Sequence, residues 1–214
     1  MFISFEGPDG CGKTTQLALL ADFLVRQGYV ICRTREPGGT PIGEQIREVL
    51  HDPANREMDP RTEILLYSAS RAQIVTQVIR PALAAGEVVL CDRFYDSTLA
   101  YQGYGHGLDL NMLRQITLFA TGGLKPDLTI YLEVAPEVGL RRRQQDQEAE
   151  WNRLDALALE FHRRVHAGYH ELIAAEPARW VVVNGERPVD AVQADIRAVV
   201  TARLSKSRLL GSEA

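Results

Sequence analysis

The chain has 214 residues, of which 45% are hydrophobic and 24% are charged, and its formal net charge is −4. This composition is typical of a globular protein, and the length suits one well-packed domain over residues 1–214. The negative charge argues against a nucleic-acid polymer as partner, because such partners select basic surfaces. No apolar run is long enough to span a membrane, and the first one does not resemble a signal peptide, so we also expect no membrane partner.

The three cysteines, Cys11, Cys32 and Cys91, are too few and too scattered to predict a disulfide framework or a zinc site. Cys32 and Cys91 lie in apolar, strand-like runs and are expected in the core. Cys11 lies in a glycine-rich loop, where we expect its backbone N–H to matter more than its thiol. This pattern suits a reducing compartment, so we expect a cytoplasmic protein.

The chain opens with an apolar run at residues 2–5, a glycine-rich loop at 7–14 and apolar residues at helical spacing over 15–24. Strand, loop and helix in this order are the context of a P-loop. Glycines allow successive backbone N–H groups to point at a phosphate, the lysine bridges the outer phosphates, and the threonine hydroxyl binds Mg²⁺. The predicted phosphate-binding residues are Gly7, Pro8, Asp9, Gly10, Cys11, Gly12, Lys13 and Thr14.

Beyond this loop, strand and helix patterns alternate along the chain. Four further strands are predicted at residues 29–34, 87–91, 127–132 and 180–183. Helices are predicted at residues 41–50, 61–84 with a bend near Pro81, 97–103, 109–120, 136–143, 153–175 and 189–204, followed by a frayed tail at 205–214. Five strands separated by helices predict an α/β fold of the P-loop NTP hydrolase type, a three-layer structure with a five-stranded parallel sheet and helices on both faces.

The predicted strand at residues 87–91 is followed directly by Asp92 and Arg93. Asp92 is placed to support Mg²⁺, directly or through water. Arg93 cannot accept a proton from water, but it can clamp a phosphate group, which favours a kinase over a hydrolase. The alternative is a surface arginine that follows a strand.

Several arginines recur near the predicted carboxyl edge of the sheet, namely Arg35, Arg47 and Arg71. Tyr67 and Arg71 are four residues apart and so share one helix face. An aromatic ring beside an arginine can stack on a base and donate to an acceptor on its edge, such as a pyrimidine 4-carbonyl. The alternative is a cation–π pair on the helix surface.

Together these motifs resemble the thymidylate kinase family over nearly the whole chain. The resemblance rests on the P-loop, on Thr-Arg-Glu-Pro-Gly-Gly-Thr at residues 34–40, on Asp-Arg at 92–93, on Ala-Tyr-Gln-Gly at 100–103 and on Lys-Pro-Asp at 125–127. It implies a single nucleoside monophosphate kinase domain that uses ATP and Mg²⁺ to phosphorylate dTMP to dTDP in dTTP biosynthesis. It also implies a homodimer, for which the apolar pattern near residues 110–119 is one candidate face.

The resemblance implies how dTMP is held. Its sugar 3′-hydroxyl would bond Asp9, its phosphate would bond Arg93 with help from Arg35 or Arg47, and Tyr101 would crowd a 2′-hydroxyl. The remaining expected dTMP residues are Glu36, Tyr67, Arg71, Thr98 and Gln102.

Among these, Tyr67 would stack on thymine and Arg71 would bond its 4-carbonyl. Thr98 and Gln102 would complete the base pocket, and the bond between Glu36 and Pro37 is expected to be cis. This chain has Tyr67 where the family usually has phenylalanine.

The resemblance also implies a catalytic lid at about residues 140–155. Gly10 stands where some relatives have a P-loop arginine, so the transition-state charge is assigned to Arg142 or Arg143 and the nucleotide phosphates to Arg153. The catalytic set implied is therefore Lys13, Arg93, Arg142, Arg143 and Asp9. From the residues alone, a solvated mixed-charge helix end is the alternative.

Two other functions remain open, namely another nucleoside monophosphate kinase, for dUMP or UMP, and a nucleotide-dependent switch or motor. The sequence also places His162, His166 and His170 four residues apart on one predicted helix. With no acidic or cysteine partner at a fixed spacing, we interpret them as polar residues of an amphipathic helix rather than as metal ligands.

Overall fold

The computed structural model describes residues 1–145, 154 and 157–211. Its centre is a five-stranded sheet in which all neighbouring strands are parallel and the order is β2-β3-β1-β4-β5. The strands are β1 (Phe2–Glu6), β2 (Ile31–Arg35), β3 (Val88–Asp92), β4 (Leu128–Glu133) and β5 (Trp180–Asn184). The predicted fold class is confirmed, and each strand lies within about a residue or two of its expected bounds.

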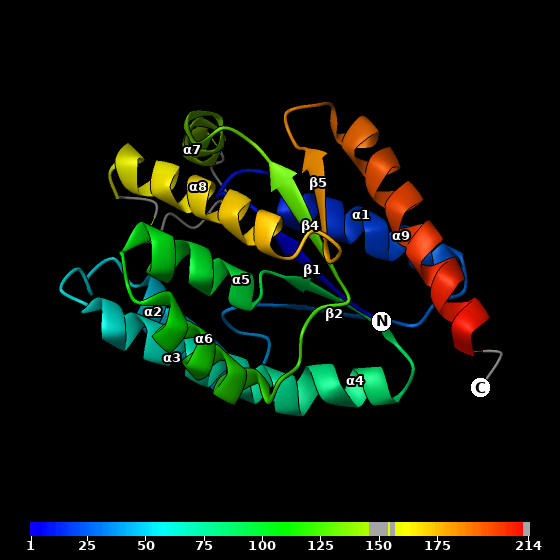
Figure 1. Ribbon diagram of the computed structural model, residues 1–214, viewed down its shortest axis with the longest axis horizontal. Coiled ribbons are helices and arrows are strands. Elements are labelled where there is room, and N and C mark those ends of the chain that lie inside the picture. The colour runs from blue at the N-terminus through cyan, green and yellow to red at the C-terminus, as the bar shows by residue number, and fades with distance from the viewer. Residues whose placement is uncertain (146–153, 155–156, 212–214) are drawn as a thin grey trace.

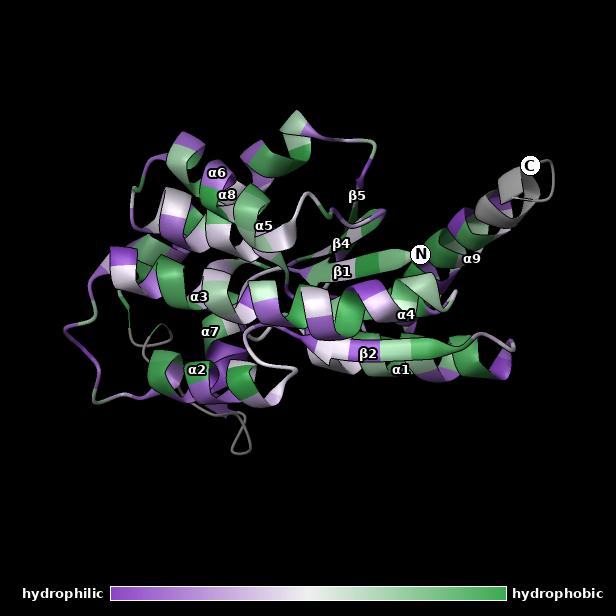
Figure 2. Ribbon diagram, turned by 90° about the horizontal axis from the view of Figure 1, so that it is seen from below, coloured by the Kyte–Doolittle hydropathy of each residue, from purple (hydrophilic) through white to green (hydrophobic). Residues whose placement is uncertain are grey.

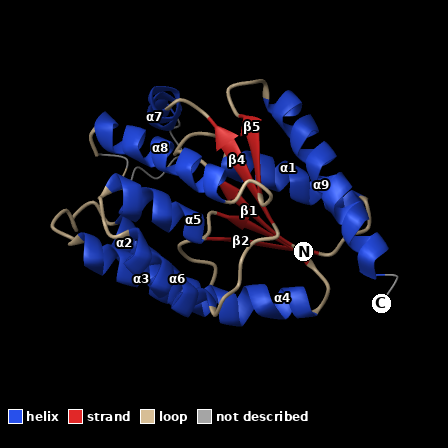
Figure 3. Cartoon of the chain, in the orientation of Figure 1, coloured by secondary structure: helices blue, strands red, loops and turns tan. Residues whose placement is uncertain are grey.

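Helices cover both faces of this sheet (Figures 1 and 3). One face carries α1 and α9, which also contact each other. The longer connections from β2 to β3, from β3 to β4 and from β4 to β5 supply the other helices. The helical segments are α1 (Lys13–Arg26), α2 (Pro41–His51), α3 (Pro60–Ile74), η1 (Val75–Ile79), α4 (Arg80–Ala84), α5 (Tyr95–Thr98), η2 (Leu99–Gly105), α6 (Leu110–Thr121), α7 (Pro136–Gln145), α8 (Leu159–Ala175) and α9 (Val189–Gly211).

Two apolar cores flank the sheet because alternate side chains of each strand point to opposite faces. On β1, Ile3 and Phe5 face α1 and α9, whereas Phe2 faces the core formed with α3, η2 and α8. β1 is hydrophobic over most of its length, as Figure 2 shows. Strands that are buried on both faces in this way are typical of parallel sheets, and their near-continuous apolar runs made them predictable.

The structure corrects four helix predictions, one of which is the helix expected at residues 153–175, because α8 begins only at Leu159. The helix expected to bend at Pro81 instead changes to π-helix at η1, where the Arg80 N–H donates to the carbonyl oxygen of Val75. Since Pro81 has no N–H to donate, the irregular turn lies before it and the proline falls in the first turn of α4. The helix expected at residues 97–103 begins at Tyr95 and becomes π-helical in η2. The last helix, α9, continues to Gly211, into the tail that was expected to be frayed from residue 205.

The parallel strands bring three loops to one edge of the sheet. The connections that follow β1, β2 and β3 all leave from the carboxyl ends of the strands, which is where ligands of open α/β sheets bind. Within the described residues, every helix is too short or too polar to cross a membrane.

A buried ion pair fastens α5 to the start of β5. Arg179 donates to both carboxylate oxygens of Asp96, at 2.6 and 2.9 Å, and their side chains are 10% and 0% exposed. We expect Asp96→Ala to lower the free energy of unfolding by about 3–5 kcal/mol, because it leaves the Arg179 charge buried without its partner.

The matched control is Asp195→Ala, which breaks an exposed ion pair with Arg187. This change should cost less than about 1 kcal/mol. Urea denaturation of both variants measures the difference, and equal, small losses would contradict the assigned role of the buried pair.

Candidate active site

A cavity of about 440 Å³ opens at the carboxyl edge of the sheet. It is lined by the P-loop, the segment after β2, one face of α3 and the segment after β3. All ten residues predicted to hold the acceptor nucleotide line it, namely Asp9, Arg35, Glu36, Arg47, Tyr67, Arg71, Arg93, Thr98, Tyr101 and Gln102.

The same cavity reaches the predicted phosphate site. Gly10, Gly12, Lys13 and Thr14 contribute to its lining, together with Asp92, Arg142 and Arg143. Gly7, Pro8 and Cys11 shape the loop without lining the cavity. Phosphate-binding and base-binding groups therefore share one continuous space.

Lys13 begins α1 and folds back over its own loop. Its Nζ donates to the carbonyl oxygens of Gly7 and Pro8, at 3.1 and 2.9 Å, and lies 3.5 Å from the Cys11 Sγ. Although it lines the cavity, the Lys13 side chain is largely buried. The ammonium group is thus held at the helix N-terminus, where the backbone field also favours an anion.

Gly10 has no room for a side chain. Its φ is +73°, and a Cβ at this position would collide with the carbonyl oxygen of Gly139 on α7. A Cβ on Gly139 would in turn meet the carbonyl oxygen of Asp9. The P-loop and the helix that leads into the predicted lid therefore touch backbone to backbone.

Two oxygen ligands suited to Mg²⁺ lie side by side next to the P-loop. The Thr14 hydroxyl donates to Asp92 Oδ2 at 2.6 Å. A hydroxyl and a carboxylate match the preference of Mg²⁺ for oxygen ligands, and both residues line the cavity. The two residues predicted to hold the metal therefore fit it.

The Arg93 side chain connects the end of β3 to four other parts of the structure. Its guanidinium donates to Asp9 Oδ1 at 2.6 Å and to the Gly7 carbonyl at 3.0 Å, which fastens it to the P-loop. Further hydrogen bonds reach Ser97, Tyr101 and Tyr169 at 3.1, 3.2 and 3.4 Å. The three accepting hydroxyl groups lie on α5, η2 and α8.

The backbone of Arg93 is also unusual. Its φ is +66°, the only positive value among the described residues other than glycine. This conformation costs free energy for an L-residue and is typical of functional sites that the surroundings hold in place. The Arg93 N–H donates to the Phe5 carbonyl at 2.9 Å, so β1 supplies part of that support. An exposed surface arginine, the alternative interpretation, is excluded.

Asp9 carries the charge opposite to Arg93. Burial alone would raise the pKa of its carboxyl, but Arg93, Lys13 and a hydrogen bond from Tyr101 outweigh burial and hold that pKa well below its ordinary value. The Tyr101 hydroxyl donates to Asp9 Oδ2 at 2.7 Å. Asp9 is therefore ionised, and both its oxygens are fixed in direction.

Arg71 is more deeply buried than Arg93, with only 1% of its side chain exposed. Its guanidinium donates to Glu36 at 2.7–2.8 Å and to the Thr98 hydroxyl at 3.0 Å, and lies over the Phe94 ring. The alternative of a surface cation–π pair with Tyr67 is therefore wrong. Glu36 therefore forms an ion pair with Arg71. The expected cis peptide bond between Glu36 and Pro37 is present.

Gln102 is oriented by a residue that the sequence analysis missed. Its amide nitrogen donates to the fully buried Glu63 carboxylate at 2.6 Å. Glu63, Tyr67 and Arg71 recur every four residues on α3, so this spacing could have identified Glu63 as part of the same face. Because the amide nitrogen of Gln102 donates to Glu63, its amide oxygen is the group that can accept a hydrogen bond from a ligand.

Arg35 and Arg47 meet at one carbonyl. Both donate to the Pro37 oxygen, at 2.8 and 3.3 Å, and Arg35 also pairs with Glu44. Both arginines line the cavity, and their predicted role of assisting Arg93 stays a prediction.

The predicted lid is described only in part. Arg142 donates to the Gly185 carbonyl at 3.0 Å, and both Arg142 and Arg143 line the cavity from α7. Arg153 and most of residues 140–155 lie outside the described residues.

Three further polar groups surround Arg93 and were not predicted. Glu6, at the end of β1, accepts from the Phe94 N–H and from the hydroxyls of Ser97 and Tyr169, at 2.8, 2.5 and 2.8 Å. Ser97 follows Arg93 by four residues, which is a usable signal, but Tyr169 comes from a distant helix.

The Glu6 carboxyl should make stability depend on pH. Burial, with a smaller contribution from Asp96, raises its pKa from 4.5 to about 7 against the lowering effect of Arg93. Between these values the folded protein binds more protons at this site than the unfolded chain does, so stability falls as pH rises.

We therefore expect the free energy of unfolding of the wild type, relative to Glu6→Gln, to fall by about 1–3 kcal/mol between pH 4.5 and 7. Glutamine does not titrate, so urea denaturation of both proteins across this range isolates the effect. A difference that stays constant with pH would contradict it.

Comparisons with known proteins show the family of the chain. A sequence profile of the thymidylate kinase family matches residues 5–196. Thymidylate kinase of Deinococcus radiodurans is 53% identical over 203 residues, covering 95% of this chain and 97% of that protein. The same enzyme of Roseiflexus castenholzii is 51% identical over 211 residues, covering 94% and 92%.

A solved structure shows the same fold. The crystal structure of thymidylate kinase from Ehrlichia chaffeensis superposes with a TM-score of 0.78 at 32% identity, covering 94% of this chain and 98% of that one. Fold, family profile and close relatives agree: the chain belongs to the thymidylate kinase family.

Proposed function

We propose that this protein, as a single nucleoside monophosphate kinase domain, transfers the γ-phosphoryl group of ATP to dTMP in the presence of Mg²⁺, yielding dTDP for dTTP synthesis. Family membership supports the enzyme class, a phosphotransferase that acts on dTMP. The observation that carries the proposal is the shared cavity, because Lys13 of the P-loop, Arg93 and the buried Arg71 all line one space.

The base pocket offers one donor and one acceptor. Arg71 is donor-only and is held in place by Glu36 and Thr98, while the Gln102 amide presents its oxygen because Glu63 holds its nitrogen. A 4-carbonyl next to an N3–H, as in thymine or uracil, complements this pair. Cytosine has the opposite pattern and would leave buried polar groups unpaired.

Asp9 and Tyr101 support the sugar assignment. The ionised Asp9 carboxylate can accept a hydrogen bond from the 3′-hydroxyl, and Tyr101 lines the cavity beside it. We propose that Tyr101 leaves too little room for a 2′-hydroxyl, so that deoxyribose is preferred. Tyr67, also on the cavity wall, would stack on the base.

Positioning and charge stabilisation would carry the catalysis, with little acid–base work. Arg93, assisted by Arg35 or Arg47, would orient the dTMP phosphate so that one of its oxygens attacks the γ-phosphorus in line. The bond from that phosphorus to the bridging oxygen then breaks, and ADP leaves with the electron pair. Lys13 would offset the charge that develops on the bridging oxygen.

Thr14 and Asp92 would hold Mg²⁺, Asp92 directly or through a water molecule. The ion would neutralise phosphate charge when bound. Arg142 or Arg143 would add positive charge from α7 in the transition state, and Arg153 is proposed to contact the nucleotide phosphates. The backbone contact between Gly10 and Gly139 keeps α7 against the P-loop, which supports this assignment.

Two other functions stay as alternatives, another nucleoside monophosphate kinase and a nucleotide-driven switch or motor. A coupled assay for ADP release with MgATP and dTMP, dUMP, UMP, dCMP or no acceptor separates all three. We expect turnover with dTMP, weaker turnover with dUMP because one methyl is worth only about 1–3 kcal/mol, and little with dCMP or UMP. ADP release that needs no acceptor would contradict the kinase assignment.

The Lys13→Ala variant tests the phosphate site directly. Loss of one fixed charge donor should lower kcat by about 100- to 1000-fold, while dTMP binding changes little because Lys13 lies on the ATP side. Steady-state kinetics and dTMP titration provide the two measurements, and the unfolding transition checks the fold. Near-normal turnover in a folded variant would contradict the role.

We further propose that the protein is a cytoplasmic homodimer. The free state of Cys11, Cys32 and Cys91 supports a reducing compartment. Leu118 and Phe119 of α6 are 61% and 89% exposed, and the neighbouring α3 exposes Leu65. Adjacent exposed side chains of this size are typical of an interface.

A charge placed in this apolar face should separate the subunits. We expect Phe119→Glu to convert a dimer into a monomer in light scattering coupled to size exclusion. Val25→Glu, on an exposed α1 position, is the matched control and should leave the mass unchanged. A dimer that persists in Phe119→Glu would place the interface elsewhere.

A further inference from the structure

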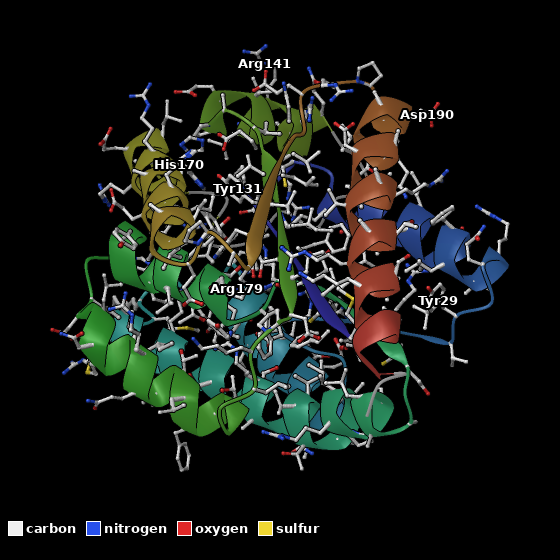
Figure 4. All side chains as sticks on the ribbon, turned by 45° about the vertical axis from the view of Figure 1, so that its right-hand side comes forward. Tyr29, Tyr131, Arg141, His170, Arg179 and Asp190 are labelled. Atoms are coloured by element: carbon white, nitrogen blue, oxygen red, sulfur yellow. The ribbon has the colours of Figure 1, made fainter. Side chains whose placement is uncertain are left out.

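A cluster of two histidines and one glutamate lies outside the cavity described above. Glu133 is the last residue of β4 and shares a sheet face with Tyr131, because side chains alternate along a strand. That face packs against α8, where Tyr131 contacts the ring of His170 (Figure 4). His166 lies one turn earlier on α8, so both imidazoles face Glu133.

The distances bring three ligand atoms together. His166 Nε2 lies 2.5 Å from Glu133 Oε1, and His170 Nε2 lies 3.2 Å from Glu133 Oε2 without the geometry of a hydrogen bond. All three ligand atoms fall within 4.8 Å of one another. In the chain, Glu133 lies 33 residues before His166 and 37 residues before His170.

This arrangement revises the interpretation of the three histidines. His162 is buried and takes no part, whereas His166 and His170 converge on a carboxylate from another element. The sequence showed the helical spacing of the histidines. It did not show their acidic partner, because Glu133 comes from β4 and only the folded structure places it beside α8. The reason for rejecting a metal site therefore no longer holds for this pair.

We propose that Glu133, His166 and His170 bind a divalent zinc ion. Imidazole nitrogen and carboxylate oxygen are preferred zinc ligands with bonds of about 2.0–2.2 Å, which corresponds to ligand atoms about 3.3 Å apart in a tetrahedron. The present spacing needs only side-chain adjustment to meet it. Glu133 and His166 also line a hollow with Asn184 and Glu186, and water from this hollow can supply a fourth ligand.

The bound ion would have a structural effect. It would join α8 to the end of β4, next to Tyr169, whose hydroxyl contacts Arg93, Ser97 and Glu6. Zinc would thus stabilise the helix that supplies Tyr169 without entering the cavity. A plain ion pair between Glu133 and protonated histidines is the competing explanation, and it requires no metal.

Measuring zinc binding to untagged protein in excess Mg²⁺ distinguishes a zinc site from a metal-free ion pair. We expect isothermal titration to give one equivalent of Zn²⁺, and Co²⁺ to give the visible absorption of a tetrahedral site with imidazole ligands. His170→Ala and Glu133→Gln should each weaken binding by at least about tenfold. The matched control is Glu171→Gln, an exposed carboxylate adjacent to His170 that should change nothing.

A thermal melt supplies an independent readout. Zinc should raise the melting temperature of the wild type and of Glu171→Gln, but not that of His170→Ala. Because His170 is half-exposed, this variant should fold, and its melt without metal verifies that. The proposal is overturned if zinc does not bind stoichiometrically, or if His170→Ala and Glu133→Gln bind it as the wild type does.

Discussion

The arrangement of the site depends on the hydrogen bonds of the Arg93 guanidinium, which is largely buried. Arg93 sits at the carboxyl end of β3 in a left-handed backbone conformation and donates to Asp9, to the Gly7 carbonyl and to three hydroxyl groups from separate helices. Burying such a charge is costly unless it is paired and hydrogen-bonded, and here the ionised carboxylate of Asp9 lies against it. The P-loop, η2 and α8 are therefore positioned relative to one another by one side chain.

In the acceptor pocket, too, buried carboxylates hold the groups that would contact the substrate. Arg71 is buried and held by the carboxylate of Glu36, and Gln102 is held by Glu63. In each case a second residue fixes the direction of the group that would meet the substrate. Such preorganisation lowers the cost of ordering side chains when substrate binds, and it makes a mismatched base expensive because buried polar groups lose their partners.

The sequence predicted what depends on local spacing. The glycines, Lys13 and Thr14 lie within eight residues, and the strand before and helix after them are locally encoded. The five-strand parallel sheet followed from apolar runs that are buried on both faces. All ten expected acceptor residues line one cavity, since the ends of parallel strands meet at a single edge.

The sequence could not predict contacts between distant elements. Tyr169 lies 76 residues from Arg93, and Glu133 lies 33 residues from His166, so no periodicity links them. The sequence also did not predict the partners of Arg71. Helical spacing suggested Tyr67 as its neighbour, whereas in the structure its guanidinium contacts Phe94 and Glu36. These contacts depend on how distant elements pack together and not on local secondary-structure propensity.

The most direct test of the account compares dTMP with thymidine as ligands of wild type and Arg93→Lys. Lysine keeps the charge but not the planar set of donors, so the advantage that the phosphate gives dTMP over thymidine should fall by at least about tenfold. Isothermal titration measures all four affinities. If Arg93→Lys lowers both affinities equally, or leaves the advantage of dTMP intact, Arg93 does not hold the acceptor phosphate and the account is wrong.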